Sequence, residues 1–169
     1  MSVNSTASAK KPKVGLRLIY DIASQYGKAS QSVSDYIINA IEGDGKGNTP
    51  SEIRIRLQKG ILTIYDNGPG MLKEDLEYHL YKLFSSRKDP RKTMGRFGYG
   101  LYGGISVSNE ITILTKKMYE HFETVARITK CQELIKEAEK EDKDLEVLGD
   151  FLEIKTEKIE IVDKHFTQI

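Results

Sequence analysis

Apolar and polar positions along the chain follow two periods, one typical of helices and one typical of strands. Apolar residues at helical spacing, together with glycine and cap signals, predict helices over residues 16–26, 33–42, 72–84, 101–107 and 132–148. Alternating or β-branched runs predict strands over residues 53–57, 61–66, 111–115, 122–129, 151–154 and 158–162. Lys59-Gly60 is a turn signal, so the first two strands form a predicted hairpin that ends at Asp66. The third and fourth strands are expected to pair antiparallel.

Composition narrows the class of protein but not its chemistry. A length of 169 residues suits one domain with a sizeable core, and we expect a disordered polar tail over residues 1–13 followed by a single domain over 14–169. The net charge of +1 argues neither for nor against nucleic acid. Cys131 is the only cysteine, which excludes an internal disulfide framework. With no export signal and no run of 18 apolar residues, a cytoplasmic protein without a membrane partner is expected.

The strand over residues 61–66 delivers one carboxylate, Asp66, into the turn Asn67-Gly68-Pro69-Gly70. Two glycines let the backbone approach a ligand closely, and Pro69 stiffens the turn between them. The same letters also fit a plain turn, because Asn-Gly and Pro-Gly are common turn dipeptides. Taken alone, this stretch therefore allows either a binding site or a turn.

The helix over residues 33–42 has an apolar face and a polar stripe. Asp35, Asn39 and Glu42 stand at positions i, i+4 and i+7 of that stripe, where they could all meet one ligand. A solvated helix face is the alternative. Asn39 fits that alternative least well, because asparagine is a poor helix former.

A second glycine cluster, Gly95 to Gly100, reads GRFGYG and precedes the helix over residues 101–107. Its GxxGxG spacing is not the dinucleotide pattern GxGxxG, and no GxxxxGK[ST] phosphate loop occurs. Free backbone N–H groups at such a loop suit an anion such as a phosphate chain, whereas a flexible loop is the alternative. The basic segment 85–93, just before it, is predicted to be a mobile cover.

Taken together and in this order, the three motifs resemble those of the GHKL ATPases. The resemblance covers roughly residues 30–161 and implies the Bergerat fold, an α+β two-layer sandwich with helices on one face of a mixed, mainly antiparallel sheet. Within the superfamily it points to the branch of MutL, MORC, the heat-shock chaperones and topoisomerase VI B. Two stretches are similar to MutL, LYGGISVSNEITILTKK and GDGKGNTPSEIRI. Histidine kinases fit less well, because only about thirty residues precede the asparagine-bearing helix.

At the adenine end of the site, the resemblance implies that the Asp66 carboxylate accepts a hydrogen bond from the adenine amino group. Gly68 and Gly70 would let the base lie against the backbone, and Met71 would line the purine pocket. Family members usually have a late threonine that assists adenine binding. Thr156 is the candidate here, although an alternative alignment from Gly149 onward lacks it.

At the phosphate end, the resemblance implies that Asn39 binds Mg²⁺, which bridges the triphosphate oxygens. Segment 85–93 would be a lid over ATP, with Lys88 as a phosphate contact. The remaining nucleotide-binding residues would come from the glycine loop: Gly95, Phe97, Gly98, Tyr99 and Gly100.

The residue expected to activate water is Asp35, where hydrolysing family members usually have glutamate. Because aspartate is one methylene shorter, its reach to the water is reduced. The leading hypothesis is an ATP-binding domain with slow Mg²⁺-dependent hydrolysis that acts as a nucleotide-driven conformational module. One alternative is an ATP-binding switch without useful hydrolysis, and another is a histidine-kinase-like phosphotransfer domain. ATP and ADP are the expected ligands. The expected partners are a second copy of the chain, in an ATP-dependent homodimer, and a DNA or protein client that is reached through a further domain.

Overall fold

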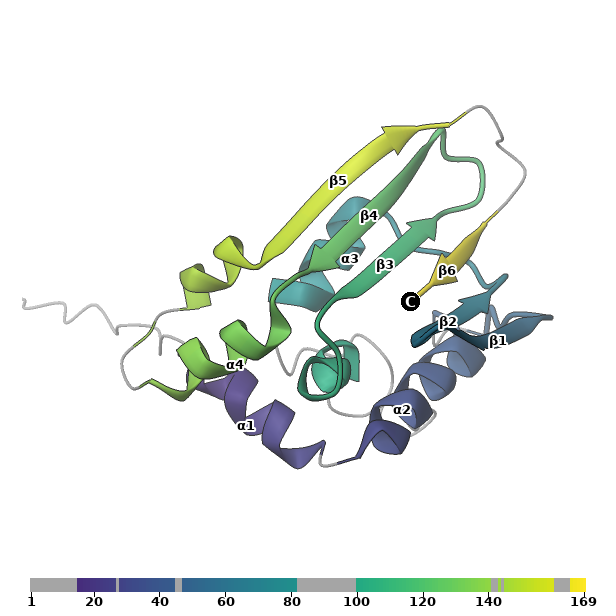
Figure 1. Ribbon diagram of the computed structural model, residues 1–169. Helices are drawn as coiled ribbons and strands as arrows, with labels where there is room; N and C mark the ends of the chain where they lie inside the picture. The colour runs from purple at the N-terminus through teal and green to yellow at the C-terminus, as the bar shows by residue number, and fades with distance from the viewer. Residues whose placement is uncertain are drawn as a thin grey trace, which may run out of the picture.

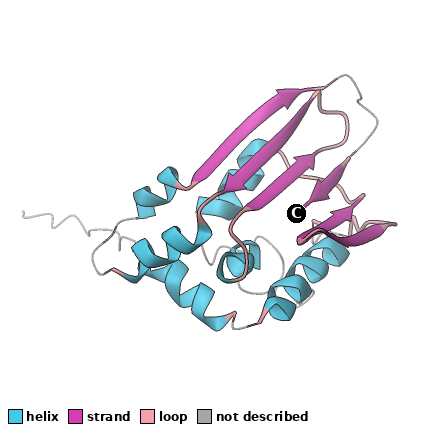
Figure 2. Cartoon of the chain, viewed as in Figure 1, coloured by secondary structure: helices cyan, strands magenta, loops and turns pink. Residues whose placement is uncertain are grey.

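The computed structural model describes residues 15–26, 28–44, 47–81, 100–140, 143, 145–159 and 165–169. The predicted tail, 1–13, and the predicted lid, 85–93, lie outside these ranges. None of the helices in the described ranges has the length and apolar character needed to cross a membrane. Figure 2 distinguishes helices from strands, which follow one another in this order: α1 (Arg17–Gln25), α2 (Ala29–Glu42), β1 (Ile53–Gln58), β2 (Ile61–Asp66), α3 (Lys73–Tyr81), the 3-10 helix η1 (Gly100–Ser106), β3 (Ile111–Lys116), β4 (Phe122–Ile128), α4 (Cys131–Glu139), the 3-10 helix η2 (Leu145–Asp150), β5 (Leu152–Lys158) and β6 (Phe166–Gln168).

The strands form one sheet in the order β1-β2-β6-β3-β4-β5, and every neighbouring pair is antiparallel (Figure 1). The predicted α+β fold is therefore confirmed, as is the antiparallel pairing of β3 with β4. The β1–β2 hairpin is also confirmed. Its two turn residues both have positive φ, 49° at Lys59 and 79° at Gly60, as a type I′ hairpin turn requires.

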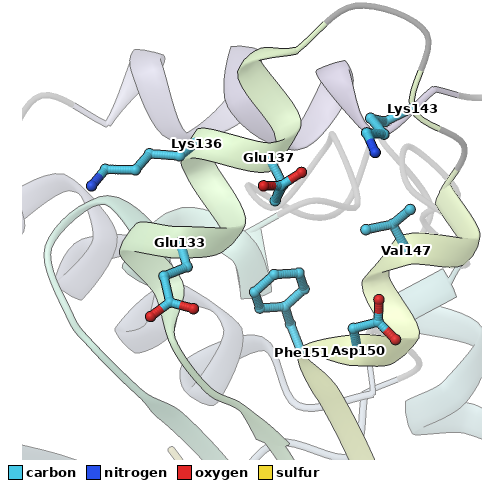
Figure 3. Close-up of a pocket in the computed structure, with 7 residues that line it drawn as sticks. All are labelled: Glu133, Lys136, Glu137, Lys143, Val147, Asp150 and Phe151. Atoms are coloured by element: carbon cyan, nitrogen blue, oxygen red, sulfur yellow. The ribbon is translucent and has the colours of Figure 1, made fainter.

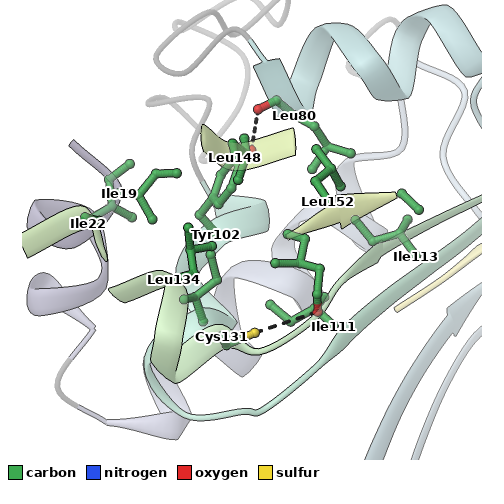
Figure 4. Close-up of a cluster of buried hydrophobic side chains, with 14 of the residues drawn as sticks. Ile19, Ile22, Leu80, Tyr102, Ile111, Ile113, Cys131, Leu134, Leu148 and Leu152 are labelled. Carbon is green, nitrogen blue, oxygen red and sulfur yellow. Dashed lines mark hydrogen bonds between the residues drawn. The ribbon is translucent and has the colours of Figure 1, made fainter. Parts of the chain in front are cut away.

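One face of the sheet carries the main hydrophobic core. Cross-strand pairs such as Ile111 with Ile128 and Ile113 with Ala126 point to this face, and the helices pack over them. The hydroxyl of Tyr102 donates to the Leu80 carbonyl within the cluster. Figure 4 shows that helices and strands contribute together, with Ile19, Ile22, Leu80, Tyr102, Ile111, Cys131, Leu134, Leu148 and Leu152 among the labelled side chains.

The C-terminal third differs from the sequence prediction in three places. The single helix expected over 132–148 is wrong, because α4 ends at Glu139, Lys140 is extended, and η2 follows separately. All residues from Glu139 to Asp144 are charged, so a continued helix would have no apolar side chain to bury there. The two strands expected over 151–154 and 158–162 are replaced by one, β5, and residues 160–162 lie outside the described part. Strand β6 was not predicted at all.

Candidate functional site

Asp66 is the last residue of β2, and only 8% of its surface is exposed. Its Oδ1 accepts a hydrogen bond from the Gly68 N–H at 2.8 Å. Burial raises the pKa of Asp66, whereas the Gly68 hydrogen bond and the nearby His165 lower it. The His165 Nδ1–H donates to the Gly68 carbonyl at 2.5 Å. The end of β2 thus presents a buried acceptor whose position is fixed by the turn that follows it.

Asn67 holds this turn to the segment before β1. Its Oδ1 accepts hydrogen bonds from the backbone N–H groups of Ser51, at 3.0 Å, and Glu52, at 2.8 Å. Its Nδ2 donates to the Ser51 hydroxyl at 2.9 Å. The asparagine of the DNGPG turn therefore has a structural part, which positions the glycines beside Asp66.

Gly70 brings the same turn against the end of β3. Its φ is +64°, and a β-carbon placed there would lie 1.9 Å from the Lys116 carbonyl oxygen. The N–H of the next residue, Met71, donates to Thr115 Oγ1 at 2.9 Å. Only glycine fits this contact, because any side chain would collide with the backbone of β3. The backbone therefore passes close to β3 beside Asp66.

A row of polar side chains crosses the sheet from Asp66. In register, Asp66 faces Thr167, Thr167 faces Thr115, Thr115 faces Thr124, and Thr124 faces Thr156. The hydroxyl oxygens of Thr115 and Thr167 lie 3.2 Å apart. Thr156 is exposed at the far end of the row, four strands from β2, or roughly 19 Å at the usual strand spacing. The structure does not bring Thr156 to Asp66, and it places Thr167 there instead.

Asp35 and Asn39 lie one turn apart on α2 and face the start of η1. A β-carbon on Gly100 would be 3.2 Å from Asn39 Nδ2 and 3.7 Å from Asp35 Oδ2, so the third motif does meet the first. The hydroxyl of Tyr26, at the end of α1, donates to Asp35 Oδ2. Both α2 side chains are half-buried rather than fully solvated. Sequence reasoning missed Tyr26, whose apolar spacing marked it only as a core residue.

Two glycines of η1, Gly103 and Gly104, allow α2 and the end of α1 to pack closely against η1. The Ser32 hydroxyl donates to the Gly103 carbonyl at 2.6 Å, and the Gly104 N–H donates to the Tyr36 hydroxyl at 3.0 Å. A β-carbon on Gly103 would lie 2.6 Å from the Tyr26 ring, and one on Gly104 would lie 2.4 Å from the Tyr36 oxygen. Burial raises the pKa of Tyr36, which keeps this acceptor neutral. These contacts fix the direction in which α2 presents its polar stripe.

Most of the residues predicted for the phosphate end of the site lie outside the described part of the chain. Lys88, Gly95, Phe97, Gly98 and Tyr99 lie outside the described residues, and their assignments stay predictions. Gly100 is the one member of the predicted glycine loop within the described ranges. Glu42, the third member of the α2 stripe, is half-buried.

A cavity of about 380 Å³ lies elsewhere, between α4 and η2 (Figure 3). Phe151 lies in the middle of the labelled lining side chains, and the side chain of Lys136 extends away from the others. It holds none of the residues predicted for the site and is lined by Glu133, Lys136, Glu137, Lys143, Val147, Asp150 and Phe151.

The donor set on α2 suits a hard cation held together with phosphate oxygens. Asn39 offers an amide oxygen and Asp35 a carboxylate, and Mg²⁺ prefers oxygen ligands. Gly100 has no side chain to cover either group. No cluster of three His, Cys, Asp or Glu side chains that could hold a metal occurs among the described residues.

The sequence matches a known family over most of its length. The family model described as histidine kinase-, DNA gyrase B- and HSP90-like ATPase matches residues 28–160. The chain therefore belongs to this ATPase family, the GHKL superfamily, which includes the chaperone branch and to which ATP binding is general.

Among curated proteins, the chain is similar to chaperones named HtpG. The chaperone protein HtpG of Helicobacter pylori strain J99 is 36% identical over 90 residues, 46% of this chain and 14% of the chaperone. That of Bacillus licheniformis is 29% identical over 102 residues, 52% of this chain and 16% of the chaperone. That of Bacillus subtilis strain 168 is 34% identical over 67 residues, 34% of this chain and 11% of the chaperone. The chain thus spans a small fraction of these relatives, and the similarity to MutL stays a prediction.

Proposed function

We propose that this domain binds ATP with Mg²⁺ between α2 and the turn at residues 66–71, and that it hydrolyses the nucleotide slowly. The observation that carries the proposal is the meeting of Asp35 and Asn39 with Gly100, residues from two motifs far apart in the sequence. α2 also packs directly on β2 through Tyr36 and Ile64. The α2 side chains that meet Gly100 and the carboxylate of Asp66 therefore border the same helix–sheet interface.

At the adenine end, the Asp66 carboxylate would accept from the amino group of the base. The backbone of Gly68 and Gly70 would give the ring a flat surface, and Met71 would contact its edge. Thr167 replaces Thr156 in this proposal, because its side chain shares the helix-facing side of the sheet with Asp66 in the adjacent strand. The hydrogen-bonded pair Thr115 and Thr167 would then set the acceptor and donor pattern that the base meets.

At the phosphate end, Asn39 would hold Mg²⁺ through its amide oxygen. The ion held there would supply positive charge that offsets the negative charge of the phosphates. Gly95, Gly98 and Gly100 would wrap the phosphates with backbone N–H groups, and Lys88 would contact them from the lid. Their loop carries no side chains at the three glycines, which suits close approach of an anion.

Asp35 would orient the attacking water and accept its proton. The Tyr26 hydroxyl holds Oδ2, which leaves Oδ1 as the proton acceptor and makes Tyr26 a positioning residue. Because aspartate is shorter than the usual glutamate, the water must sit closer to α2, and slow turnover is expected. The same contact favours the second candidate function, an ATP-operated switch, since a carboxylate committed to Tyr26 is a weaker base.

Phosphate release from Mg²⁺–ATP separates these functions when the native chain, Asp35→Asn and Asp35→Glu are compared. For the ATPase, the native chain releases phosphate and Asp35→Asn stops the release while ATP binding is retained. For the switch, only Asp35→Glu releases phosphate. If no variant binds or hydrolyses ATP, both functions are wrong. An ATP-dependent homodimer and a client reached through a further domain stay predictions.

A further inference from the structure

Strand β1 forms one edge of the sheet. In the described part of the chain it pairs with β2 alone, and Figure 1 shows it at the right-hand border of the molecule, next to α2. Its sequence, IRIRLQ, alternates apolar and polar residues and contains no proline or glycine. The edge strand is therefore regular and accessible along its length.

The hydrogen-bond pattern shows which residues face the open edge. The Asn67 N–H donates to the Glu52 carbonyl at 3.2 Å, in the same register as the β1–β2 ladder. Because antiparallel strands alternate hydrogen-bonded and non-bonded pairs, Arg54 and Arg56 also bond to β2. Ile55 and Leu57 then direct their backbone N–H and C=O groups outward. Their free backbone groups are available to another strand.

The side chains of these same two residues are exposed and apolar. Ile55 is 52% exposed and Leu57 is 74% exposed, although both lie on the helix-facing side of the sheet, opposite Ile64 and Leu62. A strand docked on this edge would cover both. The other edge, β5, differs, because its exposed positions are mostly charged or hydroxyl side chains. β1 is thus the edge that gains apolar contact from pairing.

The opposite face of β1 carries positive charge. Arg54 makes a bidentate pair with Glu52, at 2.6 and 2.8 Å, and lies over the Tyr65 ring. Arg56 is exposed and forms no ion pair within the described residues. Lys59 follows in the turn. A docked strand would place every second side chain on the face of Arg56, and at the position beside Arg56 an acidic residue is favourable and a basic one is not.

We propose that the edge of β1 binds an extended segment of a partner protein in which apolar and acidic residues alternate. The segment adds an antiparallel strand, with its apolar side chains over Ile55 and Leu57 and its carboxylates beside Arg56. A second copy of this chain fits less well. The register that sets Ile55 against Leu57 of the other copy also sets Arg56 against its own counterpart.

The test uses two fluorescein-labelled seven-residue peptides, one alternating glutamate and valine and one alternating lysine and valine, with binding followed by anisotropy. Leu57→Pro removes an outward N–H without touching the β1–β2 ladder. Lys158→Pro is the matched control, because the Ile159 N–H bond to the His121 carbonyl shows that Lys158 points its own N–H away from β4. Circular dichroism confirms that each variant is folded.

The native chain is expected to bind the glutamate peptide at least tenfold more tightly than the lysine peptide. Leu57→Pro should weaken this binding about tenfold, the scale of one lost net hydrogen bond with its apolar contact, and Lys158→Pro should leave it unchanged. Arg56→Glu, a surface change, should reverse the preference. Equal affinity for the two peptides, no binding, or an equal loss in both proline variants would overturn the proposal. A concentration-dependent dimer that Leu57→Pro abolishes would also overturn it by making a second copy the occupant.

Discussion

Replacing Gly70 by alanine tests how closely the turn after Asp66 packs against β3. A β-carbon there would lie 1.9 Å from the Lys116 carbonyl oxygen and 2.6 Å from the carbonyl carbon, far inside ordinary contact distance. The turn would have to move away from β3, which would lengthen the 2.9 Å bond from the Met71 N–H to Thr115. The left-handed backbone adds about 1–2 kcal/mol and the forced displacement about 1–3 kcal/mol, so we expect a loss of about 2–5 kcal/mol in unfolding free energy.

Gly60→Ala is the matched control. Its φ is also positive, +79°, but no heavy atom lies within 4 Å of the added β-carbon. Gly60→Ala should therefore lower the unfolding free energy only by the cost of the left-handed backbone, about 1–2 kcal/mol. Urea unfolding of the two variants measures the difference. If Gly60→Ala and Gly70→Ala lower the unfolding free energy equally, the inference that Gly70 lies in close contact with β3 is wrong.

Three further predictions concern the site. Thr167→Val should weaken ATP binding, measured by calorimetry, about tenfold, the scale of one lost hydrogen bond. Thr156→Val should leave the affinity unchanged, and the reverse result would favour Thr156 as the threonine that assists adenine binding. Tyr26→Phe should slow phosphate release about tenfold and change ATP affinity little, because the loss of a fixed Asp35 carboxylate outweighs its gain in basicity; an unchanged or faster rate would remove Tyr26 as a positioning residue. Burial raises the pKa of Asp66 above its ordinary value of 3.8, so the folded state holds this proton more tightly than the unfolded state. Unfolding free energy should then fall as pH rises from 3.8 through the raised pKa, and urea unfolding of Asp66→Asn should lack this part of the slope.

Local periodicity accounts for what the sequence could predict. The alternation in residues 53–66, with Lys59-Gly60 at its centre, encodes the hairpin almost to the residue because both the pattern and the turn are local. The polar stripe of α2 is equally local, and Gly100 does meet Asp35 and Asn39. Local sequence patterns therefore predicted the hairpin and α2, and the structure brings Gly100 of the third motif to Asp35 and Asn39 of the first.

The remaining parts depend on contacts between distant segments. Strand β6 is three residues long, and its position between β2 and β3 follows from pairing across the sheet, which no local pattern shows. For that reason no local pattern pairs Thr167 with Asp66, whereas the choice of Thr156 follows only from the family's late threonine. Tyr26 was missed because an aromatic residue at helical spacing looks like core, and its hydroxyl contact with Asp35 exists only after α1 and α2 meet.

The most direct measurement of the central claim is calorimetric titration of ATP with Mg²⁺ into the native chain and Asp66→Asn. The native chain is expected to bind. The variant should bind about 10- to 100-fold more weakly, because a hydrogen bond to a charged acceptor contributes about 1.5–3 kcal/mol. Its unfolding free energy at neutral pH should be equal or higher, because a buried charge is removed while the asparagine oxygen still accepts from the Gly68 N–H. Equal ATP affinity in the two proteins, or no binding by the native chain, would contradict the assignment of Asp66 and the site built around it.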